Sequence, residues 1–305
     1  MKTFNYVDLT YLELEALDRA NTVFLSAISP LETHGAHLPL GTDIFIAESL
    51  RDLIARKLDA KYPELQFVIL PTLALGSDAI PVKGSVRVRY KAILGALLDT
   101  GQTLSSFGFK YWILTDNHGG PHHQMAIELA GRELAGKKLN LIAPFNTLFR
   151  RMVAHDPDLL EKTGLGPGSC GDSADAHGGT NETSLMLAIA PEKIREIWKQ
   201  TGPGRESAKQ LPFHLLSGIS KILRSLGAND AATDFDFLAH GLTWVSDPKM
   251  EPYQGNPSIA TKEAGEAMIN YHADLGVELF EQARAGKQVF QKPLGWSIRA
   301  LRDLI

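Results

Sequence analysis

The chain has 305 residues, of which 44% are hydrophobic and 22% are charged, and this composition excludes the disordered and fibrous classes. It holds 31 basic and 35 acidic residues, for a formal net charge of −4, and no basic run is long enough to neutralise a series of phosphates. We therefore expect no nucleic-acid partner, and we expect residues 1–305 to form a single domain.

The sequence also predicts a cytoplasmic location. Its one cysteine, Cys170, cannot form an internal disulfide, and the first residues lead into no apolar stretch typical of a signal sequence. The longest apolar runs, such as residues 67–75, fall far short of the roughly 20 residues that span a bilayer, so no membrane contact is expected.

Strand and helix patterns alternate along the first half of the chain. Short runs rich in β-branched, aromatic and aliphatic residues predict buried strands at 22–29, 66–73, 110–115 and 139–143. Apolar residues recur every three or four positions in the helices predicted at 44–58, 90–107 and 122–136. This alternation predicts an α/β fold, a three-layer α/β/α sandwich with a mainly parallel central sheet.

The second half is less regular until its last helix. Residues 198–254 combine short helix-like pieces, such as 213–226, with turns that contain Gly, Asp and Pro, and we interpret them as an elaboration of the same domain. A long helical pattern at 261–285 follows, with Ser258 or Thr261 as its N-cap.

Residues 32–43 place two carboxylates and two imidazoles in one glycine-containing loop after the first predicted strand. The four are Glu32, His34, His37 and Asp43. Carboxylate oxygen and imidazole nitrogen are ligands that divalent ions such as zinc prefer, and Gly35 and Gly41 allow a tight backbone around an ion. The alternative is a polar turn in which Asp43 is the N-cap of a helix that begins at Ile44.

Two more polar clusters follow buried segments, at residues 116–123 and 172–184. His118 lies at the carboxyl end of a predicted strand, where ligand sites of parallel sheets gather, together with the loops at 29–34 and 76–78. His122 and His123 are better interpreted as helix-capping residues. For Glu182 and His177 a structural interpretation is equally open, with Glu182 as a first-turn helix acid and His177 as a loop residue.

Together the clusters resemble the creatininase family. Its first motif, Glu-x-His-Gly-x-His-Leu-Pro-Leu-x-Thr-Asp, is present at residues 32–43 with every signature position filled. Its Asn-Gly-His-Gly-Gly-Asn element resembles residues 117–120, its His-Ala-Gly-x-x-Glu-Thr-Ser element resembles residues 177–184, and its tail motif resembles residues 255–261. The resemblance runs from about residue 20 to about residue 285 and is weakest at 198–254.

The resemblance implies a two-metal site. Asp43 would bridge two divalent ions, with Glu32 and His118 completing one site and His34 and Glu182 the other. Zinc is expected, with manganese or iron as alternatives, because mixed carboxylate and imidazole sites accept all three. His177 would assist proton transfer to the leaving nitrogen, a role suited to an unperturbed pKa near 6.5. The resemblance also implies a homo-oligomer, such as a hexamer.

Three departures from the family pattern bear on the substrate. Creatininase proper carries a metal-binding Glu where this chain has Gly120, so Glu182 would take over that role and activity on creatinine is not expected. Asn117 replaces a Gly, and Pro121 replaces an Asn.

The resemblance implies a metal-dependent amidohydrolase that cleaves a C–N bond of a small-molecule amide. The expected substrates are a cyclic amide, a formamide or a short peptide. A non-catalytic metal-binding member of the family and a two-metal phosphoesterase are the alternatives, and the scarcity of Arg and Lys in the motif loops disfavours the latter.

Overall fold

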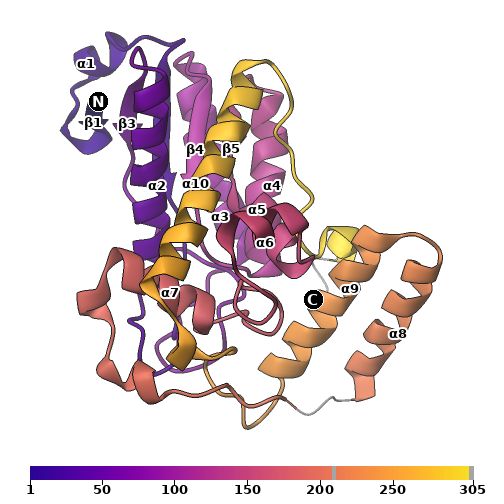
Figure 1. Cartoon of the computed structure of the whole chain (residues 1–305). Coiled ribbons are helices and arrows are strands. Elements are labelled where there is room, and N and C mark those ends of the chain that lie inside the picture. Colours follow the sequence, from indigo (N-terminus) through magenta and orange to yellow (C-terminus); the bar gives the residue numbers. More distant parts are fainter. Residues whose placement is uncertain (208–210, 302–305) are drawn as a thin grey trace.

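A five-stranded parallel sheet forms the centre of the molecule (Figure 1). The structure, a computed structural model, describes residues 1–207 and 211–301. The strands run in the order β1-β3-β2-β4-β5, and each neighbouring pair is parallel. They are β1 Lys2–Asn5, β2 Thr22–Ala27, β3 Gln66–Ile69, β4 Tyr111–Thr115 and β5 Asn140–Ile142.

Helices cover both faces of the sheet, because the buried central strand β2 sends successive side chains to opposite sides. Val23 and Leu25 pack in one core cluster with α2 (Thr42–Lys61) and α10 (Lys262–Arg284). Phe24 packs in a second cluster with α3 (Tyr90–Ser106) and α4 (Pro121–Ala135). The predicted three-layer α/β/α sandwich is confirmed.

The four predicted strands and the predicted helices of this core are all present, with ends shifted by a few residues. The edge strand β1 was not predicted. The alternative in which Asp43 is a helix N-cap is wrong, since Gly41 is the N-cap of α2 and Asp43 lies in the first helical turn. At α10 the N-cap is Thr261, whose side chain accepts the backbone N–H of Ala264 at 3.1 Å.

Smaller elements surround the sandwich. The helices are α1 Tyr11–Glu15, α5 Phe145–Val153, α6 Pro157–Thr163 and α7 Thr180–Ile189. Short 3-10 helices lie at Tyr6–Asp8, Pro191–Lys193, Glu196–Gln200, Pro257–Ile259 and Trp296–Leu301. Among the residues the structure describes, no helix is both long and apolar enough to cross a membrane.

The region 198–254 contains two long helices, of which the sequence predicted the first as the helix-like piece 213–226 and did not predict the second. These are α8 (Leu211–Ser225) and α9 (Asn229–Val245), joined by a short turn. They pack against each other as a hairpin, and α8 lies at the outer edge of the molecule (Figure 1).

Candidate metal centre

Five side chains converge beyond the carboxyl ends of β2 and β4. Glu32 and His34 come from the loop after β2, Asp43 from the first turn of α2, His118 from the loop after β4, and Glu182 from the first turn of α7. All five are buried, with relative exposures between 0% and 8%. They form two groups that could each hold a metal ion, and the two groups share Asp43. One is Glu32, Asp43 and His118, and the other is His34, Asp43 and Glu182.

The two carboxylate oxygens of Asp43 face different imidazoles. Asp43 Oδ1 lies 3.3 Å from Nε2 of His34, while Asp43 Oδ2 lies 3.7 Å from Nδ1 of His118. Each imidazole nitrogen also faces a second carboxylate. His34 Nε2 is 3.6 Å from Glu182 Oε2, and His118 Nδ1 is 3.0 Å from Glu32 Oε2.

Backbone carbonyls fix the orientation of both rings. His34 donates from Nδ1 to the carbonyl of Glu32 at 3.0 Å, and His118 donates from Nε2 to the carbonyl of Ser77 at 2.7 Å. In a neutral ring the remaining nitrogen carries a lone pair, and here it points at carboxylates. That arrangement is repulsive unless the nitrogen takes a proton or a cation lies between the groups. Hydrogen bonds of this kind orient histidine ligands in metal sites.

The three buried carboxylates of the candidate centre favour positive charge on the groups between them. Burial lowers the pKa of His34, but Asp43 and Glu182 outweigh it and raise the pKa to about 10. The pKa of His118 also rises to about 10, because Glu32 and Asp43 outweigh burial. Burial raises the pKa of Glu182 to about 7, with Asp43 contributing in the same direction. Within the described part of the chain, His34 Nε2 and Asp43 Oδ2 are buried and have no hydrogen-bond partner.

Neighbouring groups hold the carboxylates in place. The Asn117 amide donates to Asp43 Oδ1 at 3.2 Å and to Glu182 Oε1 at 3.0 Å, so one side chain ties the two together. The backbone N–H of Ile80 donates to Glu32, and that of Gly178 donates to Glu182, at 2.5 and 2.6 Å. The sequence marked Asn117 only as a departure from the family motif. The two backbone N–H donors could not be predicted from the sequence, because every residue except proline has a backbone N–H group.

His177 stacks on His34, with ring centroids 4.1 Å apart. It donates from Nε2 to the carbonyl of Thr33 at 2.7 Å, so Nδ1 is the nitrogen left to accept a proton. Burial, together with the neighbouring His34, lowers the pKa of His177 to about 4. The premise that this residue keeps a pKa near 6.5 is therefore wrong.

The other histidines of the motif loops lie outside the two groups. His122 lies against Asp78 at 2.9 Å, and His123 lies 3.4 Å from Asp116. His37 contacts the Thr183 hydroxyl at 3.0 Å, and burial lowers its pKa to about 4. The expectation that His122 and His123 cap a helix is wrong, because Gly120 is the N-cap of α4 and both histidines lie in its first turn.

Gly120 has no room for a side chain. A Cβ built there would lie 2.4 Å from the carbonyl oxygen of Ser77 and 2.6 Å from Nε2 of His118. These two atoms form the hydrogen bond that orients the His118 ring, so neither can move without disturbing that ring. The glutamate that creatininase proper is expected to carry at this position does not fit this loop.

Proteins of related sequence include two peptidases. The chain is 24% identical over 203 residues to a protein of Mycobacterium ulcerans (strain Agy99) named mycofactocin precursor peptide peptidase, covering 65% of this chain and 70% of that protein. It is 26% identical over 215 residues to a protein of the same name from Mycolicibacterium smegmatis (strain ATCC 700084 / mc(2)155), covering 68% and 75% of the two chains.

Solved structures of similar fold include creatininases. One described as "Creatininase Mn" has a TM-score of 0.61 and 18% identity, covering 92% of this chain and 98% of that chain. A putative creatinine amidohydrolase from Bacteroides fragilis NCTC 9343 has a TM-score of 0.60 and 18% identity, covering 92% and 96%. The family model described as "Creatininase: Creatinine amidohydrolase" matches residues 7–280. Because that match spans most of the sequence, this chain belongs to the creatininase family of hydrolases.

Proposed function

We propose that the chain is a metal-dependent hydrolase that cleaves the C–N bond of an amide in a short peptide, with two divalent ions held by the five converging side chains. The observation that carries the proposal is the division of these residues into two groups that share Asp43. Glu32 and His118 would complete one metal site, and His34 and Glu182 the other.

The donor set fits such ions. Two ligand atoms at about 2.1 Å from a tetrahedral zinc ion lie about 3.4 Å apart. The separations between imidazole nitrogens and carboxylate oxygens in the two groups range from 3.0 to 3.7 Å. A cation would also relieve the buried imidazole lone pairs that face carboxylates. Zinc, manganese and iron all suit these ligand types.

Bound ions would supply a water activated for attack near neutral pH and would polarise the amide carbonyl. The residues of the chain set up that chemistry. Asp43 presents one oxygen to each group, while carbonyl acceptors hold the imidazoles in the tautomer that leaves a lone pair inward. Asn117 neutralises part of the repulsion between Asp43 and Glu182 by donating to both.

His177 is the residue proposed to move the proton. Its Nε2–H is committed to the carbonyl of Thr33, so Nδ1 is the atom that accepts a proton and passes it to the leaving nitrogen. Burial, together with the neighbouring His34, holds the pKa of His177 low, so the ring is neutral and Nδ1 carries a lone pair.

The surroundings favour an amide over a phosphate ester. A cavity of about 30 Å³ lies at the centre, and among the described residues that line it none is a lysine or arginine. A phosphoryl group brings negative charge that such side chains usually meet. The names of the two peptidase relatives favour a short peptide within the amide class.

The test is a turnover screen of the purified full chain, loaded with zinc, manganese or iron, against short peptides, formamides, cyclic amides and a generic phosphodiester. We expect amide turnover that a chelator abolishes and added metal restores. Metal binding without turnover of any amide would support a non-catalytic member. Turnover of the phosphodiester alone would contradict the amide assignment.

A further inference from the structure

A second, much larger cavity lies beside the candidate metal centre. Its volume is about 660 Å³, whereas the cavity at the centre measures about 30 Å³. A volume of 30 Å³ is that of a water molecule, and pockets for small organic ligands measure roughly 300 to 1,000 Å³. The metal centre alone therefore has no room for the rest of an amide substrate.

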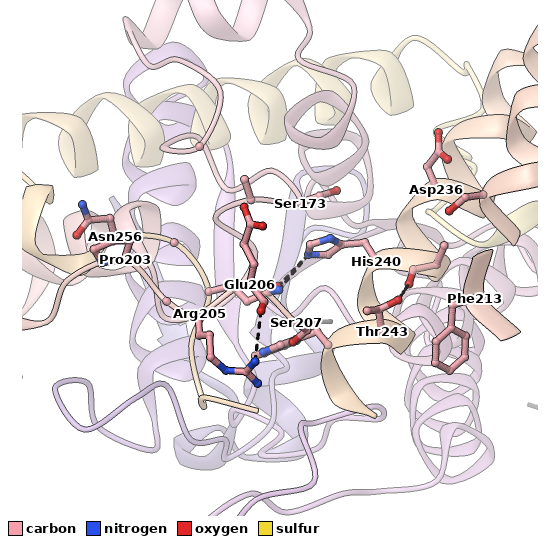
Figure 2. Close-up of a pocket in the computed structure, with 18 of the residues that line it drawn as sticks. Ser173, Pro203, Arg205, Glu206, Ser207, Phe213, Asp236, His240, Thr243 and Asn256 are labelled. Atoms are coloured by element: carbon pink, nitrogen blue, oxygen red, sulfur yellow. Dashed lines mark hydrogen bonds between the residues drawn. The ribbon is translucent and has the colours of Figure 1, made fainter. Parts of the chain in front are cut away.

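The α8–α9 hairpin builds one wall of the large cavity. Its lining residues on α9 recur at the spacing of a single helix face: Asp236, Ala239, His240, Thr243 and Trp244. Phe213, His214 and Ser217 contribute from α8. The opposite side consists of residues 203–207 and 254–256 together with Ser173 (Figure 2). Residues 198–254 thus supply most of the lining of a site beside the α/β/α sandwich.

One loop separates the two cavities. Ser173 and Ala174 line the large cavity, whereas the adjoining residues Asp175 and Ala176 line the small one. The cavities also meet at His177, whose ring centroid lies 5.4 Å from that of Trp244.

Gln254 makes a further connection. Its backbone N–H donates to the carbonyl of His177 at 2.6 Å, and its side chain contacts His240 at 3.0 Å. A molecule in the large cavity therefore touches the residues that pack directly on the proposed proton-transfer group.

Among the residues that the structure describes, the charged groups of the cavity leave one carboxylate without a partner. Arg205 is paired with Asp247, and Asp236 is paired with Arg224 at 2.7 Å. No hydrogen bond or ion pair engages the Glu206 carboxylate within residues 1–207 and 211–301. Figure 2 shows this side chain extending toward Ser173. Together with the aromatic rings of Phe213 and Trp244, an unpaired carboxylate suits a positively charged amine.

We propose that this cavity binds the remote, amine-bearing end of an extended peptide substrate, with Glu206 as the counter-ion of the amine, while the scissile amide reaches the metal centre past His177 and Trp244. The proposal rests on the proposed hydrolase function and adds the substrate's length and charge. The hairpin is then the part of the chain that selects the substrate.

Filling the cavity tests the role of substrate length. Ser217→Trp adds a bulky ring on the lining face of α8, and the matched control Lys221→Trp adds the same ring at an exposed position of α8 that does not line the cavity. We expect Ser217→Trp to raise KM for tetra-alanine about tenfold or more, to raise KM for Ala-Ala much less, and to leave metal content unchanged. Equal KM values for tetra-alanine in both variants would overturn the proposal.

Charge is tested by binding, which does not depend on turnover. Isothermal titration of the full chain compares tetra-alanine with a free amino terminus and N-acetylated tetra-alanine. We expect the free amine to bind more tightly, and Glu206→Gln to weaken it about fivefold without affecting the acetylated peptide. Glu196→Gln, an exposed carboxylate outside the cavity, is the control.

The two proposals fail in different ways. Equal affinity for both peptides, or no binding of either at millimolar concentration, would overturn the subsite even if Ala-Ala is hydrolysed. If the chain binds the free amine selectively but holds no metal and hydrolyses no amide, the proposed subsite is supported and the proposed hydrolase function is contradicted.

Discussion

In the candidate centre, each of the two histidine rings contacts a backbone carbonyl through one nitrogen and faces carboxylates with the other. These rings are those of His34 and His118. Asn117 completes this arrangement by donating to two carboxylates that would otherwise repel.

Replacing Asn117 with alanine is expected to weaken metal binding. Loss of a residue that orients ligands typically costs about 10- to 100-fold in metal affinity, and the two buried carboxylates would also repel more strongly. The dissociation constant for zinc, measured by competition with a chromogenic chelator, checks this. Asn140→Ala, in β5 and away from the centre, is the control. Unchanged affinity in Asn117→Ala would show that this amide does not support the site.

Placing a glutamate at Gly120 is expected to destabilise the chain and to give no creatinine hydrolysis. The new Cβ would press on the carbonyl of Ser77, and overpacking of this kind costs about 1–3 kcal/mol. Thermal unfolding and a creatinine assay check the two effects. Gly95→Glu, whose Cβ would meet no atom within 4 Å, should leave the melting temperature unchanged or slightly raised. A stable Gly120→Glu variant that hydrolyses creatinine would contradict the steric account.

The helices and strands of the core were predictable, because a buried parallel sheet and its covering helices leave distinct hydrophobic periods. The converging loops were predictable for the same reason, since parallel strands bring their carboxyl ends to one edge. The pairing of each histidine with a carbonyl was not predictable, because any residue can supply a carbonyl. Helix α8 was predicted to within two residues at each end, but α9 was not predicted, because its Asp and Gly residues resemble those of turns.

Helix α10 contains a buried histidine that makes stability depend on pH. Burial lowers the pKa of His272 to about 3 from an ordinary value of 6.5, so the folded chain keeps this ring neutral. The unfolded chain takes up the proton as pH falls below 6.5, and the folded chain does not until about pH 3. The stability that a neutral His272 contributes is therefore full above pH 6.5 and is lost progressively between pH 6.5 and pH 3.

His272→Gln removes that dependence. Between pH 7 and pH 5 the wild-type chain is expected to lose roughly 2 kcal/mol more than the variant, at about 1.36 kcal/mol per pH unit below 6.5. Urea unfolding at several pH values measures the difference. His214→Gln, at an exposed position on α8, should retain the wild-type slope. Identical slopes for wild type and His272→Gln would contradict the assignment.

At the scale of the whole molecule, the exposed face of α8 bears on assembly. Four apolar side chains follow one another at helical spacing and are 72%, 40%, 62% and 75% exposed: Leu215, Ile219, Ile222 and Leu226. Exposed apolar stripes of this kind mark interaction surfaces. This stripe is consistent with the homo-oligomer that the family resemblance implies.

We therefore predict that the chain is a homo-oligomer and that Leu215→Lys with Ile222→Lys reduces its mass. Two buried charges at an interface would oppose association, because each must lose its hydration. Light scattering coupled to size-exclusion chromatography measures the mass. Lys221→Ala, on the same helix, should not change it. A wild-type chain that elutes as a monomer at all concentrations would contradict the prediction.

The most direct test of the two-metal site is elemental analysis of the purified chain, prepared without chelator and offered zinc, manganese or iron, beside a Glu182→Gln variant. The site predicts about two divalent ions per chain and about one in the variant, because Glu182 belongs to one group only. Absence of bound metal in the wild-type chain, or equal metal content in both proteins, would contradict the central claim that the five residues form two metal sites joined by Asp43.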